Sequence, residues 1–566
     1  MRILFLTRSF NGLAQRLYLE LVELGHEVSI EFDISDAVTV EAVALYRPDL
    51  VVAPFLQRAI PAEVWQGTVC LIVHPGVVGD RGPSSLDWAI SEGEGTWGVT
   101  VLQAVAEMDA GPVWASETFS MRQATKSSLY RQEVTEAAVR AVVRAVHHFE
   151  LHGANPPTPP VPDPRGRWRP LMRQPDRRID WTRDDTATVL RKAHAADGTP
   201  GVLDELFGVP CHLFDLHAQA LPLPPTPTPT PTPGTLVARR HEAVLRATCD
   251  GAVWIGHVRR AGDPAALKLP VALAFAEDFA ALRPWTAADE ALAPGWRDLW
   301  TEVDGDVVSV HFPFHNGAMS TAQCGRLIAA VQDALAGPQK VLLLCGGSDF
   351  WSNGIHLNVI EAASSPAEAS WANINAIDDL AKLLIEATDH VVIAALQGNA
   401  GAGGAFLALA ADQVWARHGV VLNPHYKNMG NLYGSEYWTY LLPRRLRGAS
   451  VADVMGRRLP VSATRAQAMG LVDEIIGGTP ATFLAEARSR ARLWAARADL
   501  AAWLQAKQAR RAHDEAQKSL QAYRDEELAR MHRNFFGFDP SYHIARSNFV
   551  RRVLPSWTPR HLAVHR

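Results

Sequence analysis

A histidine and an aspartate in the first quarter of the chain have the types and spacing of a proton-transfer pair. His74 follows an apolar run and precedes Pro-Gly, so we expect it at the end of a buried strand. Asp109 lies in a Met-Asp-Ala-Gly stretch, where the glycine frees the backbone to turn. Imidazole and carboxylate groups can exchange protons near neutral pH. A structural histidine and a turn-forming aspartate would give the same pattern.

Two glycine-rich segments further along the chain could stabilise negative charge on a carbonyl oxygen. They are residues 346–357 (GGSDFWSNGIHL) and 397–407 (QGNAGAGGAFL), and each follows a predicted buried strand. The second segment opens a helix of small residues, where free backbone N–H groups meet the positive end of the helix. Two N–H groups from separate loops suit the oxyanion of a thioester. A helix of small residues can also simply pack closely, so the ordered pair of motifs carries the interpretation.

A run of ionisable and aromatic side chains follows the second glycine-rich segment. It covers residues 423–440 (NPHYKNMGNLYGSEYWTY). Tyr433 and Glu436 flank a glycine before a predicted helix, so we expect them beside the thioester site. Burial would raise the pKa of Glu436 into a useful range for an acid. Trp438 and Tyr440 are explained as well by packing in a core.

Alternating strand and helix patterns in the first 150 residues would place His74 at one edge of a sheet. The apolar runs that predict strands lie at 3–7, 27–32, 50–55 and 69–73, and helical spacing covers 13–24. This rhythm predicts a Rossmann-like parallel sheet with ligands beyond the carboxyl ends of its strands. Four polar residues of the first loop either cap the following helix or contact a ligand: Arg8, Ser9, Asn11 and Gln15.

The rest of the chain divides at changes of pattern, so we predict a multidomain α/β protein. The predicted parts are 1–160, a small OB-like β-barrel over 165–278, an α/β body over 285–480, and a helical region over 481–566. A proline cluster at 155–164 marks a linker. The Thr-Pro insert at 222–233 reads as an extended surface excursion, with a ligand for a proline-binding module as the alternative.

Composition excludes several classes of protein. The chain has 566 residues and a net charge of −5, which gives no basic face for nucleic acid. No apolar run is long enough to span a membrane. Its 5 cysteines are scattered without a CxxC pair, so we expect a reducing cytoplasm, no disulfide framework and no metal site.

The residues around His74 resemble the 10-formyltetrahydrofolate-dependent formyltransferases. The matching stretches are 74–76 (HPG), 82–85 (GPSS), 98–100 (GVT), 108–111 (MDAG) and 179–181 (IDW), the last at the start of the family's barrel-like domain. The resemblance implies that His74 and Asp109 handle protons. It implies folate contacts from Arg8, Ser9, Asn11, Gln15 and Ser84. Ile72 replaces the family's oxyanion-stabilising asparagine, so either Ser84 or Ser85 substitutes or the acceptor differs from an amine.

Residues from about 305 to 480 resemble the crotonase (enoyl-CoA hydratase/isomerase) superfamily. Beside the glycine-rich segments, the matches are 314–319 (FHNGAM) and 469–475 (MGLVDEI). The resemblance implies oxyanion N–H groups at Ile355 and Gly403. It implies coenzyme A contacts at Asn316, Asn353 and Gly354. The two glutamate positions of the hydratases hold Phe406 and His425, so we do not expect water addition.

With residues 429–438 and 542–546 (YHIAR), nearly the whole chain resembles the HypX (HoxX) family of [NiFe]-hydrogenase maturation proteins. The family implies transfer of formyl from 10-formyltetrahydrofolate to coenzyme A, then decarbonylation of formyl-CoA to CO, a lyase-type step. Tyr433 or Glu436 would manage the proton, and Arg546 would face cofactor charge or form a salt bridge. The resemblance implies small-molecule substrates, with the hydrogenase large-subunit precursor or other maturation proteins as partners. Because formyl-CoA would hydrolyse in open water, we also predict an internal passage that joins the two sites and is gated by the C-terminal helices.

Three other functions stay open at this point. The chain could be a small-amine formyltransferase fused to a separate acyl-CoA enzyme. It could be a non-catalytic scaffold built from two decayed enzyme folds. The barrel-like part also suggests tRNA formylation, but the acidic balance and Ile72 argue against it.

Overall fold

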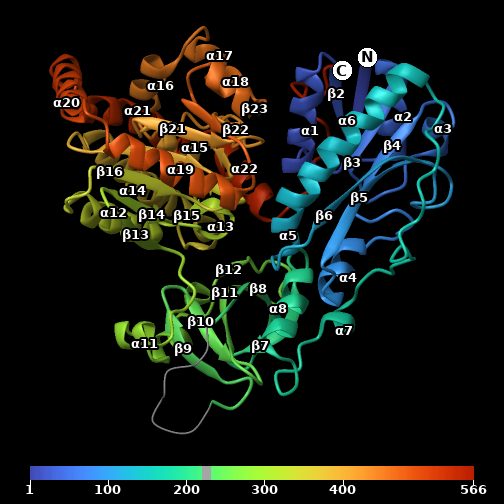
Figure 1. Cartoon of the computed structure of the whole chain (residues 1–566), viewed down its shortest axis with the longest axis horizontal. Coiled ribbons are helices and arrows are strands. Elements are labelled where there is room, and N and C mark those ends of the chain that lie inside the picture. The colour runs from blue at the N-terminus through green and yellow to red at the C-terminus, as the bar shows by residue number, and fades with distance from the viewer. Residues whose placement is uncertain (220–230) are drawn as a thin grey trace. The chain divides into compact units, whose positions relative to one another are not determined.

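The computed structural model describes residues 1–219 and 231–566, and they form two compact units (Figure 1). The first unit contains Met1–Trp296 and Pro555–Arg566, and the second contains Arg297–Leu554. The Thr-Pro insert predicted at 222–233 lies outside the described residues except for 231–233. Among the described residues, no helix has the length and apolarity needed to cross a membrane.

The first unit begins with the predicted α/β sheet, in the strand order β2-β1-β3-β4-β5-β6. The strands are β1 (Arg2–Thr7), β2 (Glu27–Phe32), β3 (Leu50–Phe55), β4 (Cys70–His74), β5 (Thr96–Gln103) and β6 (Val113–Ser120). The first four are parallel, and β5 and β6 are antiparallel additions. Parallel strands end at one edge, so His74 and the loop after Thr7 lie at the same edge of the sheet.

Helices cover this sheet on its apolar faces. They are α1 (Gly12–Glu23), α2 (Asp36–Tyr46), α3 (Ala62–Trp65), α4 (Ser85–Glu92), α5 (Lys126–Leu129), the π-helix η1 (Tyr130–Val134) and α6 (Thr135–His152). Helix α6 packs on β5, on β6 and on α1. Helix α2 contributes Ala42 and Tyr46 to a core with Leu4 and Val51.

The middle of the first unit is an antiparallel sheet, as the short alternating strands predict. Its strands are β7 (Val202–Leu206), β8 (Val209–Ala218), β9 (Leu236–Arg240), β10 (Ala243–Ala247), β11 (Ala252–Arg260) and β12 (Leu269–Pro270). They pair in the order β7-β8-β11-β10-β9, with β12 on β11, which is an open path among the described residues. The helices of this part are α7 (Gln174–Arg177), α8 (Thr186–Ala195), α9 (Val271–Ala274), α10 (Ala276–Ala281) and α11 (Ala287–Leu292).

The second unit is built on a largely parallel sheet in the order β13-β14-β16-β19-β21-β24. These strands are β13 (Trp300–Asp304), β14 (Val307–His311), β16 (Val341–Cys345), β19 (Val391–Leu396), β21 (Gln413–Arg417) and β24 (Glu474–Ile476). Two smaller sheets carry the glycine-rich segments: β15 (Ala318–Met319) with β18 (Gly354–Ile355), and β17 (Phe350–Ser352), β20 (Asn399–Gly401), β22 (Val421–Asn423) and β23 (Val461–Ser462). The two glycine-rich segments follow β16 and β19, which are neighbouring strands of the larger sheet.

Helices surround the second sheet and extend into the C-terminal part. They are the 3₁₀ turn η2 (His315–Gly317), α12 (Thr321–Leu335), α13 (Leu357–Ala362), α14 (Pro366–Glu386), α15 (Gly403–Leu409), α16 (Trp438–Arg445), α17 (Val451–Gly456) and α18 (Ala463–Ala468). The predicted helical region consists of α19 (Pro480–Ala495), α20 (Leu500–Gln517), α21 (Leu520–Phe536) and α22 (Ser541–Val550). It does not extend to residue 566, because Pro555–Arg566 lacks helix and belongs to the first unit.

The segment Pro555–Arg566 lies along β2 of the first sheet. The N–H of Ile30 donates to Leu562 O at 3.0 Å, and the N–H of Phe32 donates to Thr558 Oγ1 at 2.8 Å. Glu31 is fully buried beneath the segment and accepts from Arg566 Nε at 2.7 Å, with His565 Nε2 at 3.0 Å. These contacts cover the outer strand of the sheet with a segment from the far end of the chain.

Candidate functional sites

His74 and Asp109 come together at the carboxyl edge of the first sheet. His74 ends β4 and is 4% exposed. Its Nδ1 lies 3.6 Å from Asp109 Oδ2. Asp109 occupies a turn with φ +52°, and its Oδ2 accepts the N–H of Gly82 at 3.0 Å. The pair expected from the sequence is therefore assembled, and a backbone donor holds the aspartate in place.

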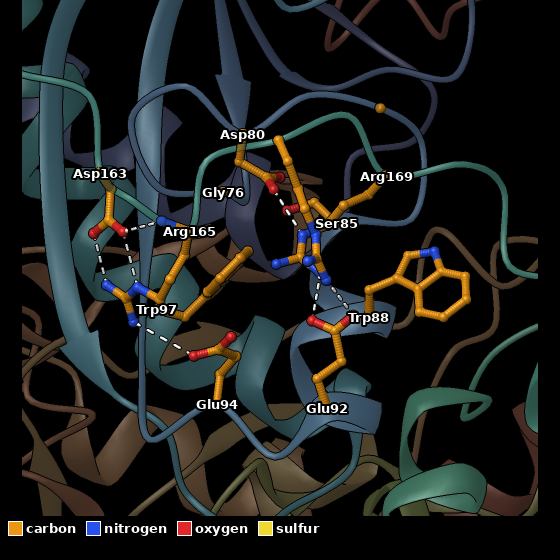
Figure 2. A network of polar contacts seen from close by, with 12 residues as sticks. Gly76, Asp80, Ser85, Trp88, Glu92, Glu94, Trp97, Asp163, Arg165 and Arg169 are labelled. Atoms are coloured by element: carbon orange, nitrogen blue, oxygen red, sulfur yellow. Dashed lines mark hydrogen bonds and ion pairs between the residues drawn. The ribbon is translucent and has the colours of Figure 1, made fainter.

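A second carboxylate, which the sequence reasoning missed, faces the other nitrogen of the same ring. Asp80 Oδ2 lies 3.2 Å from His74 Nε2, and the Asp80 side chain is fully buried. The Arg169 Nε donates to Asp80 Oδ1 at 2.8 Å (Figure 2). The available signal was an aspartate six positions after the histidine, within Gly-Asp-Arg-Gly.

The two serines considered as substitutes for the missing asparagine have backbone partners within the protein. The Ser85 hydroxyl donates to Pro75 O at 3.0 Å, and Ser84 Oγ accepts the N–H of Met172 at 3.1 Å. Both side chains are buried. These contacts give both hydroxyls a role in holding the loop, which weakens the prediction that either one replaces the asparagine at Ile72.

The four polar residues of the first loop divide into two groups. Asn11 caps α1, because its Oδ1 accepts the N–H of Ala14 at 3.0 Å, and Gln15 Nε2 donates to Phe10 O at 2.8 Å. Ser9 is exposed and Arg8 is half-buried at the edge of the sheet. The helix-capping alternative therefore accounts for Asn11, while Arg8 and Ser9 keep the predicted ligand role.

In the second unit, the two glycine-rich segments meet at the start of α15. A Cβ atom placed on Gly354 would lie 3.3 Å from the nitrogen of Gly403, so the backbones are in close contact. The N–H groups on either side of Ile355 have acceptors: Gly354 N–H to Ser352 Oγ and His356 N–H to Asn373 Oδ1, both at 3.1 Å. This arrangement fits a pair of oxyanion donors at Ile355 and Gly403.

The carboxyl group of Glu436 lies against this glycine pair. A Cβ on Gly403 would be 2.3 Å from Glu436 Oε1. The Tyr426 hydroxyl donates to Glu436 Oε2 through a very short hydrogen bond. The Glu436 N–H donates to Asp378 Oδ1 at 2.8 Å, and the residue has φ +60°. One oxygen of Glu436 therefore faces the candidate oxyanion site, and the other contacts a tyrosine.

Burial raises the pKa values of the acidic groups around Glu436. Glu436 is 1% exposed, and desolvation followed by the nearby charge of Asp378 raises its pKa well above its ordinary value. Desolvation also raises the pKa of Tyr426, so its proton stays in place. On α21, burial raises the pKa of Glu527 to about 8, and this residue accepts the Tyr437 N–H at 2.9 Å.

Tyr426, which the sequence reasoning did not select, lies beside Glu436. The ring of Tyr433 instead packs against Trp438, with ring centroids 5.2 Å apart. Phe406, at the first glutamate position of the hydratases, stacks on Tyr426 at 5.0 Å. The signal in the sequence was the phenylalanine itself, because its ring can stack on an aromatic neighbour such as Tyr426 but cannot exchange a proton.

The remaining predicted cofactor contacts are partly structural. Asn353 Nδ2 donates to Asn316 O at 2.8 Å, so one asparagine fixes the turn that carries the other. Asn316 is exposed with φ +56°. Arg546 is 4% exposed, and its Nε donates to Glu361 Oε2 at 2.8 Å. Its charge is therefore paired within the second unit, which is the salt-bridge alternative.

Comparisons with family models identify the two regions that carry these sites. The first unit matches "Formyl transferase" over residues 32–146 and "Formyl transferase, C-terminal domain" over 171–267. The second matches "Enoyl-CoA hydratase/isomerase" over 307–558. The chain is thus a fusion of a formyltransferase region with an enoyl-CoA hydratase-like region, and both predicted family resemblances are confirmed.

Relatives that span the whole chain narrow this class. The Hydrogenase maturation factor HoxX of Bradyrhizobium diazoefficiens is 53% identical over 568 aligned residues, covering 100% of this chain and 97% of the relative. HypX from Aquifex aeolicus, solved in complex with tetrahydrofolic acid, is 46% identical with a TM-score of 0.94, covering 100% and 99% of the two chains. Methionyl-tRNA formyltransferase of Ralstonia nicotianae is 26% identical along a stretch that covers 40% of this chain and 68% of the relative. The chain belongs to the HoxX/HypX family of hydrogenase maturation factors.

Proposed function

We propose that this maturation factor makes CO in two steps, one in each unit. In the first, formyl passes from 10-formyltetrahydrofolate to the thiol of coenzyme A. In the second, formyl-CoA releases CO and regenerates coenzyme A. The CO would serve the [NiFe]-hydrogenase large-subunit precursor, the partner expected from the family resemblance.

The first step is supported by the His74–Asp109 pair and by the solved relative with tetrahydrofolic acid. The C–N10 bond of the folate breaks, and a C–S bond forms. One proton leaves the thiol and one reaches N10, so the step needs a proton carrier and no net acid or base. His74 and Asp109 can carry that proton at the carboxyl edge of the sheet.

The second step is carried by one observation, the position of Glu436 Oε1 against Gly403. The thioester oxygen would accept from the N–H groups of Ile355 and Gly403. The C–S bond breaks, the formyl carbon loses its proton, and the sulfur gains one. A protonated Glu436 can donate its proton from Oε1 to the sulfur. Tyr426, hydrogen-bonded to Oε2, helps the Glu436–Tyr426 pair to take up the formyl proton.

Loss of the hydratase glutamates favours this step over water addition. Phe406 has no proton to transfer, and its ring supports Tyr426. A buried neutral carboxyl group serves as an acid better than as a base for water. The second unit therefore keeps the thioester cradle of its family with a different proton partner.

The test is to trap CO with haemoglobin while following tetrahydrofolate formation, given 10-formyltetrahydrofolate and coenzyme A. We expect CO from the wild type, and a fall of about 10²-fold in both products for His74→Ala. The matched control is His147→Ala, because that histidine is 68% exposed on α6. Wild-type tetrahydrofolate formation without CO would contradict the second step. Transfer to an amine without coenzyme A would instead favour a small-amine formyltransferase.

A further inference from the structure

We propose that Asp80 is a positioning residue for His74, held in place by Arg169, so that the imidazole lies between two carboxylates. The proposal rests on the formyl transfer proposed above. The carboxylate that the formyltransferase resemblance supplies is Asp109, on Nδ1 of the ring. Asp80 is an additional carboxylate, and it faces Nε2 at 3.2 Å.

The exposure of the three side chains gives the array a direction. The side chain of Asp80 is 0% exposed, that of His74 is 5% exposed, and that of Asp109 is 13% exposed. Asp109 is therefore the member that reaches the reactants, and Asp80 is the member furthest from them. A ring with a carboxylate at each nitrogen has one preferred orientation, because a proton on either nitrogen then has an acceptor.

Arg169 fixes Asp80 from a distant part of the sequence. Its Nε donates to Asp80, and its Nη1 donates to Glu92 Oε2 at 2.7 Å (Figure 2). The guanidinium lies over the Trp97 ring, 4.9 Å from the centroid. The N–H of Arg169 donates to Arg81 O at 2.7 Å, so the backbone is held next to the loop as well. A charge that is 2% exposed in this setting balances the buried carboxylate of Asp80.

Two glycines show that the loop is shaped around this contact. A Cβ on Gly76 would lie 2.3 Å from His74 Nε2 and 2.7 Å from Asp80 Oδ2. Gly82 has φ +107°, and its Cβ would lie 2.1 Å from Arg169 O. Any other residue at either position would displace the histidine, the aspartate or the arginine.

The array suits transfer to a thiol. The reaction moves one proton from sulfur to N10 while the formyl carbon changes partner from nitrogen to sulfur. Asp109 can accept the thiol proton and return it to N10, with His74 behind it as a fixed donor. Asp80 acts only through His74, because it has no exposed atoms with which to touch a reactant.

The test is a double-mutant cycle in single-turnover formyl transfer, following tetrahydrofolate formation. We expect Asp80→Asn to lower kcat about 10²-fold and to leave the KM for the folate within about twofold. In the His74→Ala background the same change should alter kcat by less than about twofold. Asp87→Asn is the matched control, since it breaks a partly buried ion pair between α4 and Lys126, at 2.9 Å, without removing a contact of His74.

Equal losses in both backgrounds would overturn the proposal, since Asp80 would then act on the fold rather than through His74. If Asp80→Asn does not fold, Glu92→Gln tests the same network, because it removes the partly exposed carboxylate that also binds Arg169. We expect that variant to lower kcat several-fold only when His74 is present, and an unchanged kcat would overturn the proposal. A wild type without transfer to coenzyme A would contradict the proposed function, and the positioning role would fall with it.

Discussion

The two candidate sites use buried carboxylates in opposite electrical settings. In the first unit, Asp80 has a buried guanidinium at 2.8 Å, and Asp109 accepts a backbone N–H. In the second, Glu436 has a tyrosine and a neighbouring carboxylate, and the guanidinium of Arg524 lies 3.9 Å from Asp378. The first carboxylates are thus paired with donors, whereas desolvation raises the pKa of Glu436. In the proposed reactions the same residue types act as a proton acceptor in one unit and as a proton donor in the other.

The largest expected effect separates the two sites by activity. Glu436→Gln and Tyr426→Phe should each lower CO release by about 10³-fold, because they remove the proton carried beside the thioester. Formation of tetrahydrofolate should stay within about twofold of the wild type. The matched control is Tyr433→Phe, whose ring packs on Trp438, and it should release CO normally. Unchanged CO release from Glu436→Gln would remove the acid from the second site.

Removing the buried cation should cost the first unit the most stability. Arg169→Met leaves the Asp80 carboxylate buried without its partner, so the free energy of unfolding should fall by about 3–5 kcal/mol. Denaturant unfolding followed by tryptophan fluorescence measures this. Arg492→Met, in a pair with Asp304 that is half exposed on both sides, should cost at most about 1 kcal/mol. Equal losses in the two variants would mean that the buried Arg169–Asp80 pair contributes no more to stability than an exposed pair.

The second unit should lose stability as the pH rises. A carboxyl group whose pKa is raised on folding holds a proton that the unfolded chain has released. The free energy of unfolding therefore falls as the pH rises above the ordinary pKa of 4.5. Glu436→Gln has no such proton. Relative to the wild type, its free energy of unfolding should therefore rise by up to about 1.4 kcal/mol per pH unit across the shifted range. Unfolding midpoints between pH 5 and 9 test this. Parallel curves for the two proteins would contradict a protonated Glu436.

The smallest expected effect concerns the cation nearest the second site. Arg524→Gln removes a charge 3.9 Å from Asp378, and a pair with the exposed Asp379. If burial rather than pairing sets the protonation state of Glu436, CO release should change by less than about threefold. Because the 3.9 Å contact is longer than the 2.8 Å Arg169–Asp80 pair, the free energy of unfolding should fall by less than in Arg169→Met. A loss as large as that of Arg169→Met would mean that both sites depend on charge pairing.

The sequence predicted the elements and the first members of each site better than their partners. His74, Asp109 and the glycine pair follow from local patterns, because strand ends and turns are encoded within a few residues. Asp80 was near in sequence, but its contact with His74 depends on Arg169, which lies 89 positions away. Tyr426 and Tyr433 lie in the same run of ionisable and aromatic residues. Tertiary contacts distinguish them, because the Tyr426 hydroxyl donates to Glu436 and its ring stacks on Phe406.

The return of Pro555–Arg566 to the first sheet also sets an order of events during synthesis. His565, which contacts Glu31, leaves the ribosome 534 residues after it. At about 5–20 residues per second, the outer strand β2 would wait roughly 30–100 s for its cover. Over that time the strand exposes an unpaired edge and a carboxylate without its partners. The first sheet therefore gains this cover only after the second unit has been synthesised, and a chain released before Pro555 would lack it.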